Sequence, residues 1–446
     1  MSKNLNFTLG PIFAPLIRFA LPVLAALLLQ TMYGAVDMMV VGQFAAASDV
    51  SAVSTGSWMM QLVTSFVVGI AMGTTILLGR KLGGGQRQEA GQIVGASVGL
   101  FAVIGVVLTV VMELAAPLLA AVMQTPAEAL DATISYIRIC SAGLLFIVAY
   151  NVLGSIFRGI GDSKMPLITV AIACVVNIAG DFVLVGVFHM ATAGAAIATV
   201  GAQAVSVVVS LMIIRRRGLP FPFSLDMLRP DFRRMKQVFK LGFPIAFQDV
   251  LVSISFLAIT AIVNSLGVIA SAGVGVAEKL CGFIMLVPSA FSQTMSAFVA
   301  QNMGAGREDR AKKALFYGIV SSLAVGVLMG YFSFFHGDLM AGLFARDAQV
   351  IAAAADYLKA YAIDCLLVSF MFCMTGYFSG CGRTTFVMIQ GIVGAFGVRI
   401  PVSLLMSHRL PVSLFHVGLA TPSSTLVQML LCFGYFAHVE RRKKIK

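Results

Sequence analysis

Two carboxylates stand in stretches of the chain that are otherwise almost wholly apolar. Asp37 lies within Leu21–Val41, and Asp181 lies one helical turn after Asn177 in a second apolar run. Residues four apart lie on the same face of a helix, so Asn177 and Asp181 would point the same way. A carboxylate inside a segment of membrane length costs about 3 kcal/mol or more and usually lines a pathway. The spacing therefore indicates a polar site inside a membrane-embedded helical bundle.

The depth of these two carboxylates follows from the rise of a helix. Asp37 follows Arg18, and Asp181 follows Lys164, after nearly equal lengths of apolar chain. At ~1.5 Å per residue, both carboxylates lie about 25–29 Å from the basic ends of their helices. The two groups are thus expected at one level, in the outer half of the first helical bundle.

Tyr136 and Thr199 lie about two turns inside the outer ends of their own apolar runs, at a similar level. Together with Asp37, Asn177 and Asp181 they form a set of oxygen ligands, which suits a hard cation such as Na⁺. The set equally suits a proton, because burial and a second carboxylate both favour a neutral acid. The alternative is structural, since buried polar side chains often bond neighbouring helices or their own backbone.

Composition places the whole chain in a membrane. It has 446 residues, of which 59% are hydrophobic and 11% charged, and the mean hydropathy is +0.95. A soluble domain carries about 25% charged residues. The seven cysteines include no Cys-x-x-Cys pair, and the five histidines have no metal-ligand spacing. We expect an all-α polytopic membrane protein without disulfide, structural metal or cofactor.

Twelve apolar runs are each long enough to cross a hydrocarbon core ~30 Å thick. The predicted helices are Phe13–Val41, Val50–Leu82, Ala90–Leu114, Leu130–Phe157, Met165–Phe188, Thr192–Ile214, Leu241–Leu266, Ile269–Met303, Lys313–Phe335, Val350–Gly380, Thr385–Ser407 and Val412–His438.

Basic residues alternate between the loops. Arg80, Lys81 and Arg87 lie in one loop, and Arg215–Arg217 begin a long basic linker, whereas Gln43–Asp49 and Ala115–Ala129 contain no lysine or arginine. The positive-inside rule places both termini and the linker in the cytoplasm. The linker's basic residues would hold it at the anionic membrane face. The net charge of +12 is explained in this way without a nucleic-acid partner.

The two halves of the chain resemble each other at a nearly constant offset of about half the chain's length. The matching stretches are Arg18–Pro22 with Lys240–Pro244, Leu82–Ala90 with Met303–Ala311, Tyr136 with Tyr357, and Gly159–Gly161 with Gly380–Gly382. We expect two six-helix bundles, an N-lobe of residues 1–214 and a C-lobe of residues 241–446, joined by a cytoplasmic linker of residues 215–240. Parallel repeats commonly form a substrate site at their interface and work by alternating access.

At these residues the chain resembles the multidrug and toxic compound extrusion (MATE) family, and in particular its prokaryotic DinF-like branch. The stretches that carry the resemblance are Pro22 with Asp37–Gly42, Gly83–Ala90, Arg158–Pro166 and Asn177–Asp181. The resemblance implies Na⁺ or H⁺ coupling at Asp37, Asn177 and Asp181, and drug efflux by antiport. It also implies that Gln30 and Asn151 line the cavity together with Tyr136. Pro22 would let the first helix bend, because proline removes one backbone hydrogen bond.

The second half departs from the pattern of other branches of the family. Those branches carry acidic residues in the seventh and tenth helices, but Asp249 lies too early and Asp364 is shifted by about a turn. Glu278 and Lys279 are adjacent in the sequence, and we interpret them as a local pair or as part of a cavity edge rather than as a coupling site. Arg399 could make polar contacts in the second bundle, without a partner that the sequence identifies.

Three functions remain open. The first is an antiporter, acting as a monomer in the bacterial cytoplasmic membrane, that exports lipophilic drugs or organic cations. The second is a lipid-linked oligosaccharide flippase of the same superfamily, which usually has about fourteen helices and a basic cavity. The third, a membrane enzyme, lacks any clustered nucleophile or acid–base motif, so no catalytic residue is expected. The segment Leu82–Arg87 lacks the Gly-Lys-Ser/Thr end of a phosphate-binding loop, which leaves an ion gradient as the energy source.

Overall fold

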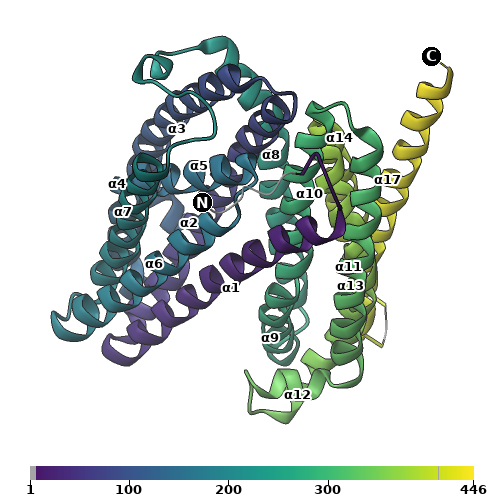
Figure 1. Cartoon of the computed structure of the whole chain (residues 1–446). Helices are drawn as coiled ribbons and strands as arrows, with labels where there is room; N and C mark the ends of the chain where they lie inside the picture. Colours follow the sequence, from purple (N-terminus) through teal and green to yellow (C-terminus); the bar gives the residue numbers. More distant parts are fainter. Residues whose placement is uncertain (1–6, 410, 446) are drawn as a thin grey trace. The chain divides into compact units, whose positions relative to one another are not determined.

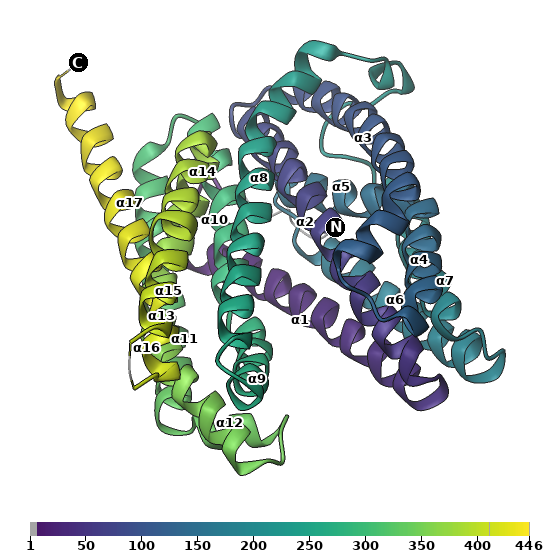
Figure 2. The same ribbon diagram turned by 180° about the vertical axis from the view of Figure 1, so that it is seen from behind.

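The computed structural model describes residues 7–409 and 411–445, and every regular element within them is a helix. Figure 1 shows the helices in chain order, and Figure 2 shows them from behind. The chain divides into two compact units, each described by itself. Unit 1 is mainly Arg18–Ala246, and unit 2 is mainly Phe247–Met303 and Arg307–Lys446. Gly10–Ile17 also belongs to unit 2, and Gly304–Gly306 to unit 1.

The helices of the first half begin and end close to the predicted positions, except that the third continues to Val122, beyond the predicted end at Leu114. They are α1 (Phe13–Phe44), α2 (Ala47–Gly83), α3 (Arg87–Val122), α4 (Ala127–Ala142), α5 (Leu144–Ile160), α6 (Lys164–Asp181), the π-helix η1 (Phe182–Val187) and α7 (Ala191–Arg217).

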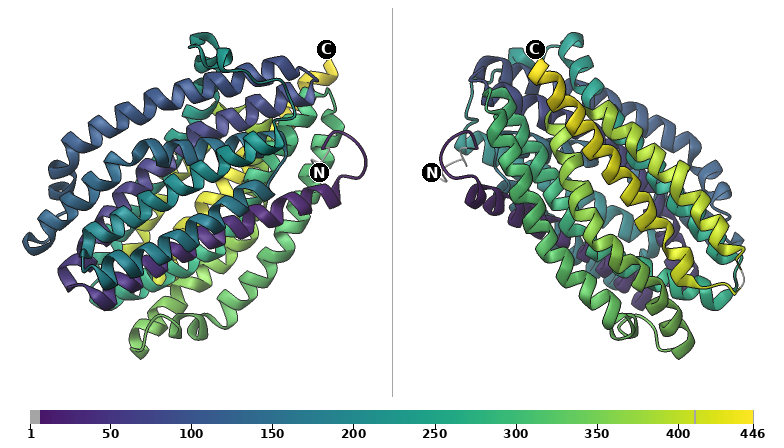
Figure 3. Two further views of the ribbon diagram at one scale, coloured as in Figure 1. Left: turned by 60° about the vertical axis from the view of Figure 1, so that its left-hand side comes forward. Right: turned by 90° about the vertical axis from the view of Figure 1, so that its right-hand side faces the viewer.

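The second half has the corresponding series. Its helices are the 3-10 helix η2 (Leu225–Leu228), α8 (Phe232–Asn264), α9 (Val268–Ile284), α10 (Leu286–Gly304), α11 (Glu308–Phe335), α12 (Gly337–Gly342), α13 (Ala348–Gly380), α14 (Thr384–Ile392), the π-helix η3 (Val393–Arg399), α15 (Ile400–Ser407), α16 (Leu414–Gly418) and α17 (Ala420–Ile445). The long helices of each unit run beside one another (Figure 3).

The described residues contain eleven helical stretches that are long and apolar enough to cross a membrane. A twelfth is made by α4 and α5 together, which meet at Gly143 with a bend of 54°. The all-α polytopic fold is therefore confirmed, with the predicted fourth helix broken near its middle. Residues 1–6 and 446, which belong to the termini predicted to be cytoplasmic, lie outside the described residues.

The surface of α3 shows how such a helix meets a bilayer. Val103, Val107, Val110 and Leu114 recur at helical spacing on one face and are all exposed. The opposite face packs against α4 and α5. A row of exposed branched side chains would be an aggregation hazard in water but is the normal surface in lipid. An outer helix face made of exposed apolar side chains is what embedding in a membrane requires.

The connection between α7 and α8 is shorter than the predicted linker, residues 215–240. Helix α7 continues through Arg217, and α8 begins at Phe232, because the basic residues there continue the helices beyond their apolar cores. The chain between them packs on α3, where a Cβ at Gly95 would lie 1.8 Å from the Met227 carbonyl oxygen. Phe221, in the same connecting segment, is buried in a hydrophobic cluster with residues of α3 such as Phe101. The connection is therefore a docked segment of unit 1.

Asp231 caps the start of α8. Its carboxylate accepts a hydrogen bond from the Arg234 backbone N–H at 3.0 Å and pairs with the Arg234 guanidinium. These bonds, the backbone one first, hold the pKa of Asp231 below its usual value. Such a cap satisfies one of the N–H groups that have no partner within the helix.

Candidate functional site

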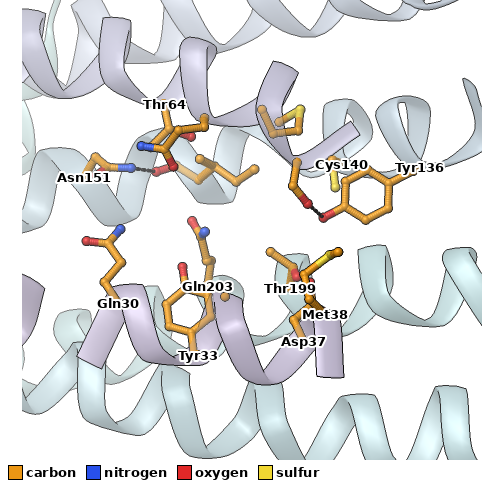
Figure 4. Close-up of a pocket in the computed structure, with 15 residues that line it drawn as sticks. Gln30, Tyr33, Asp37, Met38, Thr64, Tyr136, Cys140, Asn151, Thr199 and Gln203 are labelled. Carbon is orange, nitrogen blue, oxygen red and sulfur yellow. Dashed lines mark hydrogen bonds between the residues drawn. The ribbon is translucent and has the colours of Figure 1, made fainter. Parts of the chain in front are cut away.

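Unit 1 contains a polar cavity of ≈ 180 Å³ among α1, α2, α4, α5 and α7 (Figure 4). Its lining is Gln30, Tyr33, Gly34, Asp37, Met38, Ser57, Met60, Gln61, Thr64, Tyr136, Cys140, Ile147, Asn151, Thr199 and Gln203. Four of the residues predicted for the site from sequence therefore share its wall with Asp37, namely Gln30, Tyr136, Asn151 and Thr199. The cavity lies wholly within unit 1.

Asp37 reaches this cavity from α1, while Asp181 lies behind it at the last residue of α6. Asp37 is 5% exposed and Asp181 is fully buried. Their carboxyl groups are nevertheless close enough to interact directly. Asp181 is followed at once by the π-helical segment η1, a local irregularity that is frequent at functional sites. The structure thus brings the two predicted carboxylates together, one on the cavity wall and one beneath it.

Asn177 lies one turn before Asp181 on the same face of α6. Its Nδ2 donates a hydrogen bond to the Thr199 hydroxyl at 3.4 Å, which links α6 to α7. Helices α6 and α7 are close neighbours in unit 1. Thr199 therefore lines the cavity and also contacts Asn177, which lies behind the cavity wall.

Tyr136 is positioned from α2 as well as from its own helix α4. The phenol oxygen lies 3.0 Å from the Ser57 hydroxyl, and either group can donate the hydrogen bond. The preceding residue is Gly56, where a Cβ would lie 2.4 Å from a Tyr136 ring carbon. Only glycine leaves room for the ring at this point. The Tyr136 hydroxyl therefore faces the cavity as a fixed polar group.

Gln30 and Tyr33 lie on α1 on the N-terminal side of Asp37 and face Asn151 across the cavity (Figure 4). Both side chains line the same part of the wall, one turn apart on α1. Asn151 donates from Nδ2 to the Ile147 carbonyl of its own helix at 2.7 Å. Its side-chain oxygen is left as the group that a ligand could use.

The sequence interpretation missed five polar residues of the lining: Tyr33, Ser57, Gln61, Thr64 and Gln203. Helical spacing could have found two of them, because Tyr33 lies one turn before Asp37 and Gln203 one turn after Thr199. The three residues of α2 give no such signal, since their orientation depends on how α2 packs against α4.

Several buried oxygens of the site have no hydrogen-bond partner among the described residues. These are Asp37 Oδ1, both carboxyl oxygens of Asp181, and Asn177 Oδ1. A buried acceptor without a partner costs about 1–3 kcal/mol, and more when it carries charge. A cation or a proton at this point would satisfy these oxygens. Two carboxyls and neutral oxygen ligands suit a hard monovalent cation, and the part of the chain that the structure describes contains no cluster of three or more His, Cys, Asp or Glu side chains for a metal.

The fold and the cavity together define a class of protein. Long apolar helices surround a buried polar site with a pair of carboxyl groups in the first half of the chain, and the second half repeats the series of helices. This is the organisation of a polytopic membrane transporter. The family follows from sequence comparison, because the MatE family model matches residues 22–183 and 244–405. The chain belongs to the MATE family of multidrug efflux transporters.

Relatives and solved structures agree with this assignment. The probable multidrug resistance protein YoeA of Bacillus subtilis is 27% identical, over 96% of this chain and 94% of YoeA. The probable multidrug resistance protein NorM of Thermotoga maritima is 24% identical, over 91% of this chain and 86% of NorM. An outward-facing multidrug resistance MATE family transporter of the MOP superfamily has the same fold, with a TM-score of 0.93, 19% identity, and coverage of 100% and 99% of the two chains.

Proposed function

We propose that this protein is a secondary active antiporter that exports lipophilic cationic compounds in exchange for Na⁺ or H⁺, and that the coupling ion enters at Asp37, Asn177, Asp181 and Thr199. The observation that carries the proposal is the group of buried oxygens without partners around the two carboxyls. An ion or a proton supplies the missing partner, and among the described residues no basic side chain lines the adjoining cavity to do so.

Competition for one charge would couple the two fluxes. Asp37 lies on the cavity wall, where an ionised carboxylate attracts an organic cation. Asp181 lies behind this wall and interacts with the Asp37 carboxyl group. Entry of Na⁺ or H⁺ at the pair neutralises Asp37 and weakens the binding of the drug cation. Since a ligand shifts a conformational equilibrium only by its differential affinity for the states, the two cations must favour different states.

The cavity must widen for a drug to bind. Its volume of ≈ 180 Å³ is smaller than the roughly 300–1,000 Å³ of a typical drug pocket. Pro22 lies inside α1, several turns before Asp37, and removes one backbone hydrogen bond there. Bending of α1 at Pro22 would move the cavity wall that carries Gln30, Tyr33 and Asp37. This motion supplies the change in access between the two sides of the membrane.

The remaining parts of the proposal concern the membrane location, the oligomeric state and the energy source. The distribution of basic residues supports insertion in the bacterial cytoplasmic membrane with both termini in the cytoplasm. One chain holds the complete polar site, which supports transport by a monomer. The protein acts as a carrier that uses an ion gradient, without catalysis or a bound cofactor.

The test is efflux of a fluorescent organic cation from proteoliposomes, with Na⁺ and pH gradients imposed separately. Asp37→Asn and Asp181→Asn should each abolish gradient-driven transport, because each removes a charge from the pair. Asp131→Asn is the matched control, since Asp131 is an acid of the same unit that lies outside the cavity lining. Full gradient-driven efflux by both pair variants would show that the ion does not couple at this site. Loss of activity in Asp131→Asn as well would show that the substitutions act through folding.

A further inference from the structure

Unit 2 buries two opposite charges that the proposed coupling step does not use. Asp364, in the middle of α13, is fully buried, and Arg399, the last residue of η3, is 5% exposed. Arg399 is the one lysine or arginine, among the described residues, that is buried to this degree. Burying either charge alone is costly, so each needs compensation within the protein.

The Arg399 guanidinium is held by two neighbours on α8. One terminal nitrogen donates a hydrogen bond to the Ser255 hydroxyl at 3.0 Å. The guanidinium carbon lies 4.3 Å from the centre of the Phe256 ring, in a cation–π contact. The Arg399 Nε has no hydrogen-bond partner within the described part of the chain. These contacts fix the position of the group, but neither of them supplies a negative charge.

Asp364 is the buried acid of this cluster, and its carboxyl oxygens have no hydrogen-bond partner among the described residues. The nearby Thr425 hydroxyl donates instead to the Thr421 carbonyl at 3.1 Å. Asp364 precedes the end of α13, and Arg399 follows the start of α14, by nearly equal lengths of chain. At ~1.5 Å per residue both are about 22–24 Å from these helix ends, which puts them at one level. No ion pair of 4.0 Å or less joins them within the described part of the chain, but each lies within electrostatic range of the other.

The other titratable groups that face this pair are uncharged or acidic. Tyr357, Tyr361 and Cys365 approach from α13, and Cys281 and Glu278 approach from α9. Glu278 is only partly buried, and the Thr260 hydroxyl donates to it at 3.4 Å. Among the described residues, Arg399 is therefore the only positive charge of the cluster, and Asp364 is its most deeply buried negative charge.

The buried acids of the two units differ in their neighbours, which suggests that they have different roles. Among the described residues, the paired acids of unit 1 have no basic residue beside them, whereas the buried acid of unit 2 has Arg399. We propose that Arg399 is the built-in counter-cation of Asp364, so that unit 2 keeps its buried acid charged without a transported ion. Ion coupling is then left to Asp37 and Asp181. The inference about coupling rests on the proposed function, but the charge pair itself does not.

The charge pair is tested without transport, by thermal unfolding of the detergent-solubilised protein. Arg399→Met and Asp364→Asn each leave one charge uncompensated and should each lower the unfolding midpoint by about 6 °C or more. The double variant removes both charges and should recover at least half of that loss. Lys359→Met is the control, because Lys359 is an exposed cation on α13, and should change the midpoint by about 1 °C or less. Additive losses in the double variant would overturn the proposal.

The dependence of the unfolding midpoint on Na⁺ and on pH provides a second test. In a background of Asp37→Asn with Asp181→Asn, replacing choline by Na⁺ or lowering the pH should cause no Asp364-dependent response of the midpoint while Arg399 is present, that is, no change beyond the one seen when Asp364→Asn is added. Adding Arg399→Met should create a response to one of the two ions, since Asp364 then lacks its counter-charge, and Arg399→Lys should suppress that response. A response in the presence of Arg399, or none after its removal, contradicts the proposal. Failure of drug efflux in the unsubstituted protein would count against the proposed function alone, because both tests read stability.

Discussion

Replacing Gly56 by alanine tests how Tyr136 is held at the cavity. A Cβ built at Gly56 would lie 2.4 Å from one ring carbon of Tyr136 and 3.0–3.1 Å from two others. The ring must then shift, and it is buried among the residues that surround the cavity. The shift would break the hydrogen bond of 3.0 Å between the Tyr136 and Ser57 hydroxyls. One added methyl group should therefore disturb both packing and a polar contact.

The expected loss is the sum of two known effects. Overpacking a close-packed interior costs about 1–3 kcal/mol, and a lost hydrogen bond costs about 1 kcal/mol. Replacing a helical glycine by alanine stabilises the helix by about 1 kcal/mol, which offsets part of this loss. The net destabilisation of about 1–3 kcal/mol should lower the unfolding midpoint by about 2–4 °C per kcal/mol. A thiol-reactive dye can follow this unfolding, because six of the seven cysteines are buried. Efflux should fall in parallel.

The matched control is Gly201→Ala, since Gly201 is also helical and a Cβ there meets nothing within 4 Å. It should leave the midpoint unchanged or raise it slightly. Tyr136→Leu should remove the clash, so that Gly56→Ala costs little in that background. Equal losses from Gly56→Ala with and without the Tyr136 ring would refute the reasoning.

Three further predictions concern other contacts of unit 1. Thr199→Val removes the hydroxyl that Asn177 contacts and should weaken the coupling ion at least severalfold, measured as the Na⁺ or H⁺ concentration for half-maximal efflux. Gly95→Ala places a Cβ 1.8 Å from the Met227 carbonyl oxygen, so the docked connection should detach and become sensitive to trypsin. Asp231→Ala should cost α8 about 1 kcal/mol in thermal stability. Because the folded-state pKa of Asp231 is lowered, this contribution is present at neutral pH and is lost as the pH falls through that lowered value.

Each of these has a control. Thr64→Val changes a threonine of the same cavity that lies on α2, and equal weakening there would remove Thr199 from the ion site. Gly99→Ala adds a methyl group where nothing lies within 4 Å, so trypsin should not distinguish it from the unsubstituted protein. For Asp231, an unfolding midpoint whose pH dependence is the same with and without the carboxylate would exclude the cap as the cause.

The fold followed from the sequence because the membrane restricts the choices so strongly. A span needs about 20 apolar residues, and within the described residues each predicted run is mainly helical, with short breaks such as the one at Gly143. Depth is equally accessible, since the helical rise alone predicts one level for Asp37 and Asp181. The repeat between the halves likewise needed only the matching of short motifs such as Pro22 and Pro244, each of which lies inside a helix.

Lateral packing was not accessible in the same way. Helices that are apolar all round carry little information about which face meets which neighbour. Ser57 and Thr64 could not be assigned to the cavity before α2 was packed against α4, and the bend at Gly143 is invisible in a continuous apolar run. Asp364 and Arg399 were visible as charges, but their common level and shared neighbours appear only when α13, η3 and α8 are assembled in unit 2.

The carboxyl pair shows both sides of this division. Local spacing is enough to predict the same depth for Asp37 and Asp181, because the helical rise is constant. The placement of one carboxyl on the cavity wall and the other beneath it depends on the rotation of α1 and α6 about their axes. That rotation is set by close packing between helices far apart in the chain, which no local pattern encodes.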